Sequence, residues 1–374
     1  MENTKDKTLE FFFTGGVSLK NWESFRNLDR EAARYKEFSK FFRNIYFFTY
    51  GDSKDLEYKI KFPQNLFIFT NKWKVPSKIY SFLLPFLYKK EIKEADILKT
   101  NQMNGSWAAV IAKKLYGKKL VIRCGFEWMR FSIFKKRSFL IMPIIFLLER
   151  FSYKNADLII LPTKEDQEFV SSKFKIAESK IKIIPNHVDI NFFEPLKVKK
   201  EKNRIMAVAR LEKQKNIFSL IEAMVGIPEA KLVVFGDGSL RKDLESFSKK
   251  LGVNVTFKGS ILQDNLPKEL NKSQIFIQPS FFEGSPKSLI EAMACGLPCI
   301  GTNVPGIKDV LIHKENGYLC NTSPVSIKDA IKNLISDYNL QEKIGRNARK
   351  TIEENFSFEK ICQKELELLN SLVD

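Results

Sequence analysis

The sequence QPSFFEGSPKSLIEAMACG, residues 278–296, is the clearest structural signal in this 374-residue chain. The apolar run 275–278 predicts a strand that ends just before Pro279. A loop rich in Gly, Ser and Pro follows, and residues 288–295 are typical of a helix. A strand, a loop and a helix in this order form the βα unit from which α/β proteins are built.

The rest of the chain repeats this unit. Short apolar runs alternate with helical stretches such as 107–116 and 139–153. Several of the runs are continuous in Val, Ile, Leu and Phe, which is typical of parallel strands covered on both faces. Strands are therefore expected at 9–13, 44–49, 66–70, 96–100, 120–123, 158–162, 181–185, 204–209, 231–235, 255–258, 275–278 and 298–301.

A polar, charged stretch separates this alternation into two halves. Residues 194–203, EPLKVKKEKN, have no apolar periodicity, which predicts an interdomain linker. We therefore expect an α/β protein of two Rossmann-like, doubly wound domains that face each other across a cleft. The predicted bounds are 1–193 and 204–355, and the amphipathic end of the chain, 356–374, is expected to pack back on the first domain.

Positive charge is concentrated in the first half. The chain has 62 Lys and Arg against 44 Asp and Glu, a formal net charge of +18. Residues 1–186 contribute +15 of this charge, and the remainder contributes +3. Such an uneven distribution indicates an anionic partner for the first half: a phosphate, a membrane surface or a nucleic acid.

Composition and hydropathy exclude several classes of protein. An apolar fraction of 44% can form a sizeable core and excludes a disordered chain. Five scattered Cys and two His argue against a disulfide framework and a Cys/His zinc site. The longest apolar run, 139–148, contains a proline and is half the length of a bilayer span of about 20 residues. Since the start of the chain is polar, we expect a cytoplasmic protein, with attachment to the inner face of the cytoplasmic membrane left open.

Basic and glycine-rich loops follow two strands of the second half. Arg210 and Lys215 lie between an expected buried strand and a helix start, where a guanidinium, an ammonium and a positive helix end would favour a diphosphate. Gly236 and Gly238 follow the next strand and permit a tight turn with close approach of a ligand. The P-loop pattern GxxxxGK[ST] is absent, so this is a different kind of phosphate site.

Two glutamates follow the strand at 275–278. Glu283 lies in the loop and is placed to face a transferred group, whereas Glu291 lies on the expected helix. An ionised carboxylate only accepts hydrogen bonds, so Glu291 suits a ribose diol. The loop and helix-start amides of Ser285–Leu289 could hold a phosphate.

These motifs resemble the retaining nucleotide-sugar glycosyltransferases of the GT-B fold, in the large family 4. The resemblance is carried by VARLEKQKN (208–216), GDGSLR (236–241), FKGS (257–260), PSFFEGSPKSLIEAMACGLP (279–298) and GTNVPGIKDVLIHKENGYL (301–319). IPNHVDINFF (184–193) resembles the family's loop before the linker. The match is specific from about Ile183 to the end of the chain and looser before it.

The resemblance implies transfer of a hexose-type sugar from a UDP- or GDP-sugar to a lipid-linked or cell-surface glycan, without a metal. It assigns the donor diphosphate to Arg210 and Lys215, the donor sugar to Glu283 and the ribose hydroxyls to Glu291. The remaining donor-binding residues that it implies are Gly15, Gly16, Gly236, Gly259, Ser260, Gly284, Ser285, Pro286, Lys287, Ser288 and Leu289. The absence of any Asp-x-Asp pair agrees with metal-independent transfer.

The first half departs from the family pattern. Many members have a His after the fifth strand, whereas this chain has Cys124 there, so the role of that His cannot be transferred. Cys124 is interpreted as a small buried residue, and Arg123 or Glu127 could contact the donor or the acceptor instead. His187 replaces a common Gly and is interpreted as structural or as lining the cleft. Asp189 is expected to cap a local turn.

The basic first half fits the acceptor side of such an enzyme. Lys89 and Lys90 follow an aromatic and apolar stretch, KIYSFLLPFLYKK, and a basic run at 135–137 precedes another. Basic residues beside apolar ones suit an anionic membrane surface that carries a phosphate-bearing glycan. The alternative is that these helices are buried and the lysines are merely solvated.

Other functions remain open at this point. A nucleotide-sugar epimerase or hydrolase could use the same scaffold, and a relative that only binds glycan is a further alternative. The net charge alone would suit a nucleic-acid-binding protein, but no recognition helix, zinc module or basic-aromatic stacking strip is evident.

Overall fold

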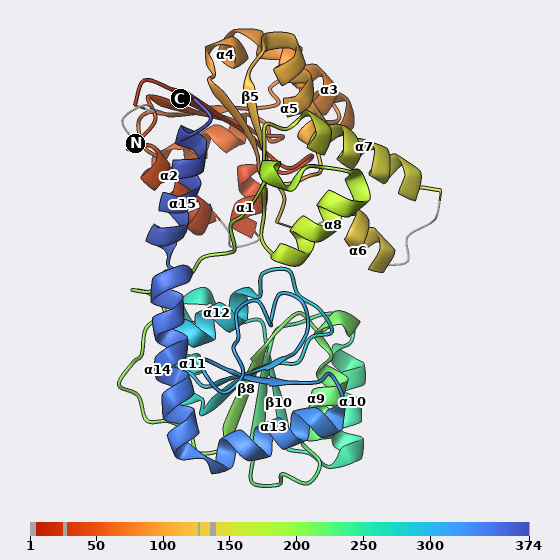
Figure 1. Cartoon of the computed structure of the whole chain (residues 1–374), viewed down its shortest axis with the longest axis vertical. Coiled ribbons are helices and arrows are strands. Elements are labelled where there is room, and N and C mark those ends of the chain that lie inside the picture. The colour runs from red at the N-terminus through yellow and green to blue at the C-terminus, as the bar shows by residue number, and fades with distance from the viewer. Residues whose placement is uncertain (1–4, 25–27, 126–127, 135–139, 374) are drawn as a thin grey trace. The chain divides into compact units, whose positions relative to one another are not determined.

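The chain forms two compact α/β units (Figure 1). The structure is a computed structural model and describes residues 5–24, 28–125, 128–134 and 140–373. Unit 1 comprises residues 1–184 and 362–374, and unit 2 comprises residues 185–361. The expected linker, 194–203, therefore falls within unit 2, and the last helix of the chain begins in unit 2 and ends in unit 1.

Unit 1 is built on a seven-stranded parallel sheet with the order β3-β2-β1-β4-β5-β6-β7. Its strands are short and mostly buried, as expected for a sheet covered on both faces. Their bounds are β1 Thr8–Phe12, β2 Asn44–Phe48, β3 Leu66–Phe69, β4 Ile97–Thr100, β5 Lys119–Arg123, β6 Leu158–Leu161 and β7 Ile181–Ile183.

Helices connect these strands. They are α1 Leu19–Ser24, α2 Leu28–Phe38, α3 Ser77–Leu87, α4 Lys89–Glu94, α5 Ser106–Tyr116, α6 Trp128–Phe134, α7 Met142–Asn155 and α8 Lys164–Phe174, with the short helical turns η1 Ser53–Lys61 and η2 Glu178–Lys180. The last helix, α15 Phe358–Asn370, lies beside α2 in Figure 1 and buries Glu365 and Leu366 in unit 1.

Unit 2 is built on a six-stranded parallel sheet with the order β10-β9-β8-β11-β12-β13. Its strands are β8 Arg204–Val208, β9 Lys231–Phe235, β10 Val255–Gly259, β11 Ile275–Gln278, β12 Cys299–Thr302 and β13 Tyr318–Cys320. Its helices are α9 Ile217–Ala223, α10 Arg241–Leu251, α11 Leu266–Lys272, α12 Lys287–Ala294, α13 Pro324–Ser336 and α14 Tyr338–Asn355, with the turns η3 Lys213–Lys215 and η4 Gln263–Asn265. Separate apolar clusters pack on the two faces of this sheet.

The order of each sheet reverses beside its first strand. In unit 1 the reversal lies between β1 and β4, and in unit 2 it lies between β8 and β11. In open parallel sheets, ligands bind outside the carboxyl ends of the strands at this switch point. The loops after β8 and β11 carry Arg210, Lys215 and Glu283. The fold therefore places these three residues at the carboxyl edge of the second sheet.

The structure confirms the α/β class and each expected strand to within about two residues. It adds β13, Tyr318–Cys320, which sequence reasoning missed because three residues give almost no periodic signal. Among the described residues, no helix is long and apolar enough to cross a bilayer.

Candidate functional site

The loops at the carboxyl edge of the second sheet hold one another in place through backbone hydrogen bonds. The N–H of Leu211 donates to the Asp237 carbonyl at 2.9 Å, and the N–H of Gly236 donates to the Gly259 carbonyl at 2.8 Å. The N–H of Phe281 donates to the Gln214 carbonyl at 2.9 Å. The loops after β8, β9, β10 and β11 therefore form one connected surface.

Gly236 permits the closest of these approaches. Its φ is 126°, and a Cβ added there would lie 1.8 Å from the carbonyl oxygen of Ala209. Any side chain would therefore push the loop after β9 away from the loop that carries Arg210 and Lys215. The sequence-based expectation of a tight turn at Gly236 is confirmed.

Glu283 is the centre of a hydrogen-bonded cluster. The Lys215 Nζ donates to the Glu283 Oε1 and Oε2 at 2.7 and 2.9 Å. The Gln278 Nε2 and the Ser280 Oγ donate to Oε1 at 2.7 and 2.6 Å. Glu283 is buried, and one cation and two neutral donors hold its carboxylate in a single orientation.

A further set of side chains fixes the members of this cluster. The Ser288 Oγ donates to the Gln278 Oε1 at 3.0 Å, and the Thr302 Oγ1 donates to the Ser280 carbonyl at 2.5 Å. Asn216 spans two loops, because its Nδ2 donates to the carbonyls of Pro279 and Thr322 at 3.0 and 2.9 Å. Support of this kind keeps a site within the narrow geometric range that chemistry requires.

Sequence reasoning missed Gln278, Ser280, Asn216 and Thr302. One signal for the first was present: Gln278 is a polar residue at the buried end of a strand, where the side chain needs a hydrogen-bonding partner. Asn216 and Thr302 have partners that are distant in sequence, so no local pattern identifies them. Ser280 lies three residues from its partner Glu283, but it is a common loop residue and its type alone gave no signal.

The loop 279–286 is also closed against the loop after β12. The N–H of Glu283 donates to the Pro305 carbonyl at 3.1 Å. Gly306 has a φ of 79°, and a Cβ there would lie 2.3 Å from the Gly284 carbonyl oxygen. The backbone around Glu283 and Gly284 thus depends on a glycine in a neighbouring loop.

Helix α12 begins within the predicted phosphate loop. Pro286 is its N-cap, and the amides of Lys287, Ser288 and Leu289 form the first turn, in which the Leu289 N–H already donates to the Pro286 carbonyl at 3.1 Å. The Ser285 side chain and carbonyl instead receive hydrogen bonds from the Asn186 N–H and Nδ2, at 2.9 and 3.0 Å. The first turn of α12 therefore provides the partial positive charge that favours an anion.

Glu291 lies one turn further along α12 and is buried. The Lys287 Nζ is 3.7 Å from its Oε1, which balances the carboxylate with a cation on the same helix. Glu283 and Glu291 thus belong to the same βα unit but have different partners.

The remaining predicted donor residues of unit 2 lie at the rim of this edge. Arg210 is exposed in the loop after β8. Gly259 ends β10 with a φ of 71°, and Ser260 follows it in an exposed position. The structure therefore brings Arg210, Lys215, Gly236, Gly259 and Glu283 to one edge of one sheet.

The glycine pair of unit 1 lies at the switch point of the first sheet. The N–H of Gly15 donates to the Asn104 carbonyl at 2.8 Å, and Gly16 has a φ of 80°. A Cβ on Gly105 would lie 2.8 Å from the Gly15 nitrogen, so the loops after β1 and β4 are in close contact. The glycine loop is thus a feature of this edge, as the sequence predicted.

Arg123 ends strand β5 in the interior of unit 1, and Cys124 directly follows it. Cys124 is fully buried, in agreement with its interpretation as a small core residue. The Arg123 Nη1 donates to the Glu365 Oε2 at 3.2 Å. Two more cations lie near the same carboxylate: the Lys99 Nζ at 3.1 Å from Oε1 and the Arg34 Nη1 at 3.8 Å from Oε2. The third candidate of this region, Glu127, lies outside the described residues.

The two residues singled out in the loop 184–193, His187 and Asp189, both make contacts within the protein. His187 is buried, and its ring lies 5.1 Å from that of Phe358 in an edge-on arrangement. The Asp189 Oδ1 accepts hydrogen bonds from the amides of Asn191 and Phe192 at 2.9 and 3.1 Å. The predicted turn cap at Asp189 is therefore confirmed.

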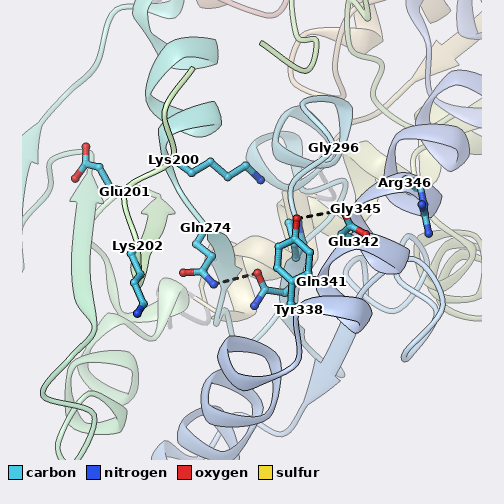
Figure 2. Close-up of a pocket in the computed structure, with 11 residues that line it drawn as sticks. Lys200, Glu201, Lys202, Gln274, Gly296, Tyr338, Gln341, Glu342, Gly345 and Arg346 are labelled. Carbon is cyan, nitrogen blue, oxygen red and sulfur yellow. Dashed lines mark hydrogen bonds between the residues drawn. The ribbon is translucent and has the colours of Figure 1, made fainter. Parts of the chain in front are cut away.

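A separate pocket of about 450 Å³ lies at the opposite edge of the second sheet (Figure 2). It is lined by Gln274 and Pro298, which directly precede β11 and β12, and by Gln341 of α14. The Gln274 Nε2 donates to the Gln341 Oε1 across its wall at 3.1 Å. None of the predicted site residues lines this pocket, and it lies at the amino ends of the strands.

The family models that match this chain describe glycosyltransferases. The model described as "Glycosyl transferases group 1" matches residues 188–351, and the model described as "Glycosyltransferase Family 4" matches residues 43–192. The two matches together span both units.

Individual proteins that are similar to this chain are also named as glycosyltransferases. An uncharacterized glycosyltransferase of Methanocaldococcus jannaschii is 32% identical over 239 residues, which are 59% of this chain and 61% of that protein. The chain thus spans less than two thirds of the length of this relative. The UDP-Gal:alpha-D-GlcNAc-diphosphoundecaprenol alpha-1,3-galactosyltransferase of Escherichia coli is 28% identical over 310 residues, which cover 77% of this chain and 78% of that protein.

The solved structure of HepE from Anabaena in complex with UDP matches the whole fold. Its TM-score is 0.77 at 18% identity, and the match covers 98% of this chain and 100% of that chain. The two parallel α/β sheets described above are therefore those of a GT-B fold.

Proposed function

The chain belongs to the glycosyltransferases of group 1 and family 4, and we propose that it transfers a hexose-type sugar from a nucleoside diphosphate sugar to a glycan acceptor with retention of anomeric configuration. In this reaction the bond between the anomeric carbon and the diphosphate oxygen breaks. A bond to an acceptor hydroxyl oxygen forms, and the hydroxyl proton is released. The departing diphosphate takes the electron pair.

The observation that carries this proposal is the pairing of Lys215 with Glu283 at the switch point of the second sheet. A departing diphosphate develops negative charge, which fixed cations and amide dipoles stabilise best where water is excluded. Lys215 and Arg210 would supply the cations, and the first turn of α12 would supply the amides. Glu283, held beside Lys215, would accept hydrogen bonds from the hydroxyls of the donor sugar.

The neighbouring residues would bind the rest of the donor. Glu291 would accept hydrogen bonds from the ribose hydroxyls. Gly259 and Ser260, at the exposed end of β10, would lie beside the base. The partly exposed backbone of Gly284 and the first turn of α12 would contact phosphate oxygens. Gly15 and Gly16 of unit 1 would contact the donor phosphates and the acceptor.

We further propose that the transfer needs no metal. Two cations and a helix end together can offset the charge that a divalent metal would otherwise neutralise at the leaving group. Turnover is therefore expected to continue in EDTA at its original rate, and a rate that is lost in EDTA and restored by Mg²⁺ or Mn²⁺ would refute this part.

The acceptor proposed here is a lipid-linked or cell-surface glycan that bears phosphate, assembled at the cytoplasmic side of a membrane. The positive charge of residues 1–186 supports an anionic acceptor for unit 1. The relative from Escherichia coli is named for a diphosphoundecaprenol-linked acceptor, which is of this kind.

A donor screen tests the function. Purified protein is mixed in turn with UDP-, GDP- and ADP-sugars, the midpoint of thermal unfolding is measured, and mass spectrometry follows the sugar with and without membrane lipid extract. We expect one donor to raise the midpoint and its sugar to appear on an extracted lipid. If no donor raises the midpoint, the proposal is wrong. If the sugar is released or epimerised equally without extract, the protein is a hydrolase or an epimerase instead.

A further inference from the structure

Helix α3, Ser77–Leu87, is apolar on its exposed face as well as on its packed face. Tyr80, Leu84 and Pro85 are buried against the rest of unit 1. The opposite side exposes Ile79, Phe82, Leu83 and Phe86, with exposed fractions of 54%, 51%, 40% and 57%. A helix that is apolar all round is normally buried on all sides, so this exposed face indicates a missing partner.

The four exposed residues form one continuous stripe, because residues three and four positions apart lie on the same side of a helix. The helix is firmly attached on its other side. The Trp107 Nε1 donates to the Ser81 Oγ at 2.9 Å, and the Tyr116 hydroxyl donates to the Pro85 carbonyl at 2.9 Å. Both partners belong to α5, which lies beside α3 in Figure 1. The α3 stripe is therefore a fixed apolar ridge.

Positive charge surrounds the α3 stripe. Between Glu57 and Glu91 the sequence contains seven lysines and no acidic residue. Five of these lysines are exposed and lie directly before, within or after α3: Lys72, Lys74, Lys78, Lys89 and Lys90. Within the described parts of the chain, no salt bridge to a carboxylate involves any of the five.

An exposed tryptophan completes the surface. Trp73 is 42% exposed, and the Lys72 Nζ lies 4.8 Å from its ring centroid. Tryptophan is enriched at the level of lipid head groups, where its amphipathic ring is partly apolar and partly solvated. Apolar residues, lysines and an exposed tryptophan thus occur together at one helix.

We propose that α3 docks unit 1 onto a bilayer that contains anionic phospholipids. The α3 stripe enters the boundary between head groups and acyl chains, and the five lysines contact lipid phosphates. An 11-residue helix is too short to span a bilayer, so α3 lies along the surface. A protein partner with an acidic, apolar groove is disfavoured, since a mainly basic surface beside a convex apolar ridge matches a lipid surface without any specific groove.

This inference goes beyond the proposed function and does not depend on it. Binding to vesicles needs neither donor nor acceptor, so a failure of one proposal leaves the other standing. Both can hold together, because docking through α3 would bring unit 1 to the surface where a lipid-linked acceptor is found.

Cosedimentation with vesicles tests the proposal. Two vesicle types are used: phosphatidylcholine alone, and equal parts of phosphatidylcholine and phosphatidylglycerol. One variant reverses charge with Lys72→Glu, Lys74→Glu and Lys78→Glu, and another breaks the stripe with Ile79→Asp and Phe86→Asp. The matched controls lie in unit 2: Lys242→Glu, Lys249→Glu and Lys250→Glu on exposed positions of α10, and Ile312→Asp with Val325→Asp, whose side chains are 56% and 66% exposed.

The wild-type chain is expected to sediment with the phosphatidylglycerol vesicles and to lose binding as salt rises. The charge variant should bind at least tenfold more weakly, since each lysine near an anionic surface contributes about 1 kcal/mol and tenfold corresponds to about 1.4 kcal/mol. The stripe variant should also bind at least tenfold more weakly, because it replaces two apolar side chains that would enter the bilayer with carboxylates. The unit 2 controls should bind like the wild type. Thermal unfolding of each variant checks that it is folded, as expected for substitutions of exposed residues.

Three outcomes would overturn the proposal. The first is wild-type protein that stays in solution with both vesicle types. The second is an equal loss of binding in the unit 2 charge controls, which would indicate a general charge effect. The third is concentration-dependent dimerisation that Ile79→Asp with Phe86→Asp abolishes, because the α3 stripe would then bind a second copy of the chain.

Discussion

Glu283 in unit 2 and Glu365 in unit 1 are both buried carboxylates, but their surroundings differ. Glu283 has one cation, Lys215, and two neutral donors, Gln278 and Ser280. Glu365 is fully buried and lies within 4 Å of three cations: Lys99, Arg123 and Arg34. Glu283 is therefore paired with a single cation, whereas three basic side chains lie around Glu365 inside a core.

This difference separates a candidate reaction site from a structural connection. The Glu365 cluster links α15 to β4 and β5 and is closed to solvent, so it holds the end of the chain on unit 1. Glu283 and Lys215 retain 9% and 19% exposure of their side chains, at the sheet edge where ligands bind. In the proposed function an incoming diphosphate would compete with Glu283 for Lys215 there, so this ion pair would be exchanged during binding.

The largest effect is expected from Glu365→Ala. Removing the carboxylate leaves three buried cations without it, and breaking a buried pair in this way costs about 3–5 kcal/mol of unfolding free energy. The midpoint of urea unfolding measures the loss. Glu367→Ala, an exposed position on the same helix, is the control and should change stability by less than about 0.5 kcal/mol. Equal midpoints for both variants would show that the Glu365 cluster does not hold α15 in place.

The second largest effect is expected from Glu283→Gln, and it should appear in catalysis. The amide keeps the size of the side chain but loses the charge and one acceptor, so kcat/KM should fall by about 10²–10³, equivalent to about 2.7–4 kcal/mol. The midpoint of thermal unfolding should change little. Glu222→Gln, at an exposed position of α9, is the matched control. Full turnover by the Glu283 variant would remove Glu283 from the proposed site.

A third buried carboxylate, Glu10 of β1, tests what happens when no cation forms a salt bridge with the carboxylate among the described residues, since Lys118 acts on it only as a weaker, opposing charge. Neither of its oxygens has a hydrogen-bond partner among the described residues, and burial, reinforced by Glu91, raises its pKa well above the ordinary 4.5. Protonated Glu10 is favoured in the folded state, and its contribution to stability is fully present at pH values below its pKa in the unfolded chain. This contribution is lost as the pH rises towards its pKa in the folded protein.

Glu10→Gln should therefore abolish this loss of stability with rising pH. The variant should match the wild type in acid and become more stable at neutral pH, with a difference that grows by about 1.4 kcal/mol per pH unit between the two pKa values. Urea unfolding across this pH range, with the exposed Glu57→Gln as control, measures the difference. A constant difference at all pH values would contradict the raised pKa.

The smallest effect on stability is expected from Lys99→Met. Burial lowers the pKa of Lys99, against the opposing effect of Glu365, and two other cations remain on that carboxylate. The unfolding free energy should change by less than about 1 kcal/mol, and kcat/KM should stay as it is. The same substitution at Lys215 should lower kcat/KM at least tenfold. If the two variants behaved alike, the distinction between the two clusters would fail.

Much of this could be predicted from the sequence, for identifiable reasons. Continuous apolar strands followed by loops with Arg210, Gly236 and Glu283 predict both the α/β fold and the edge at which these three residues meet, because parallel strands end on a common side. Strand β13 was missed because three residues carry too little pattern.

The partners of the charged residues could not be predicted. Arg123 was a candidate for ligand binding, yet its guanidinium pairs with Glu365, 242 positions away in the sequence. Likewise, the contacts of Asn216 with Thr322 and of Thr302 with Ser280 depend on segments that come together only in the folded sheet. The spacing of residues can indicate the chemistry of a single βα motif. Contacts between residues that are far apart in the sequence can be identified only in the folded structure.

The central claim is that the carboxyl edge of the second sheet binds a nucleoside diphosphate. Calorimetric titration of UDP and of GDP into the wild type and into an Arg210→Ala, Lys215→Ala variant tests it most directly, with EDTA present throughout. We predict that the wild type binds one of the two nucleotides and that the variant binds it at least 100-fold more weakly, since two charge-assisted contacts of about 1.5–3 kcal/mol each are lost. Equal affinity of the two proteins would contradict the account.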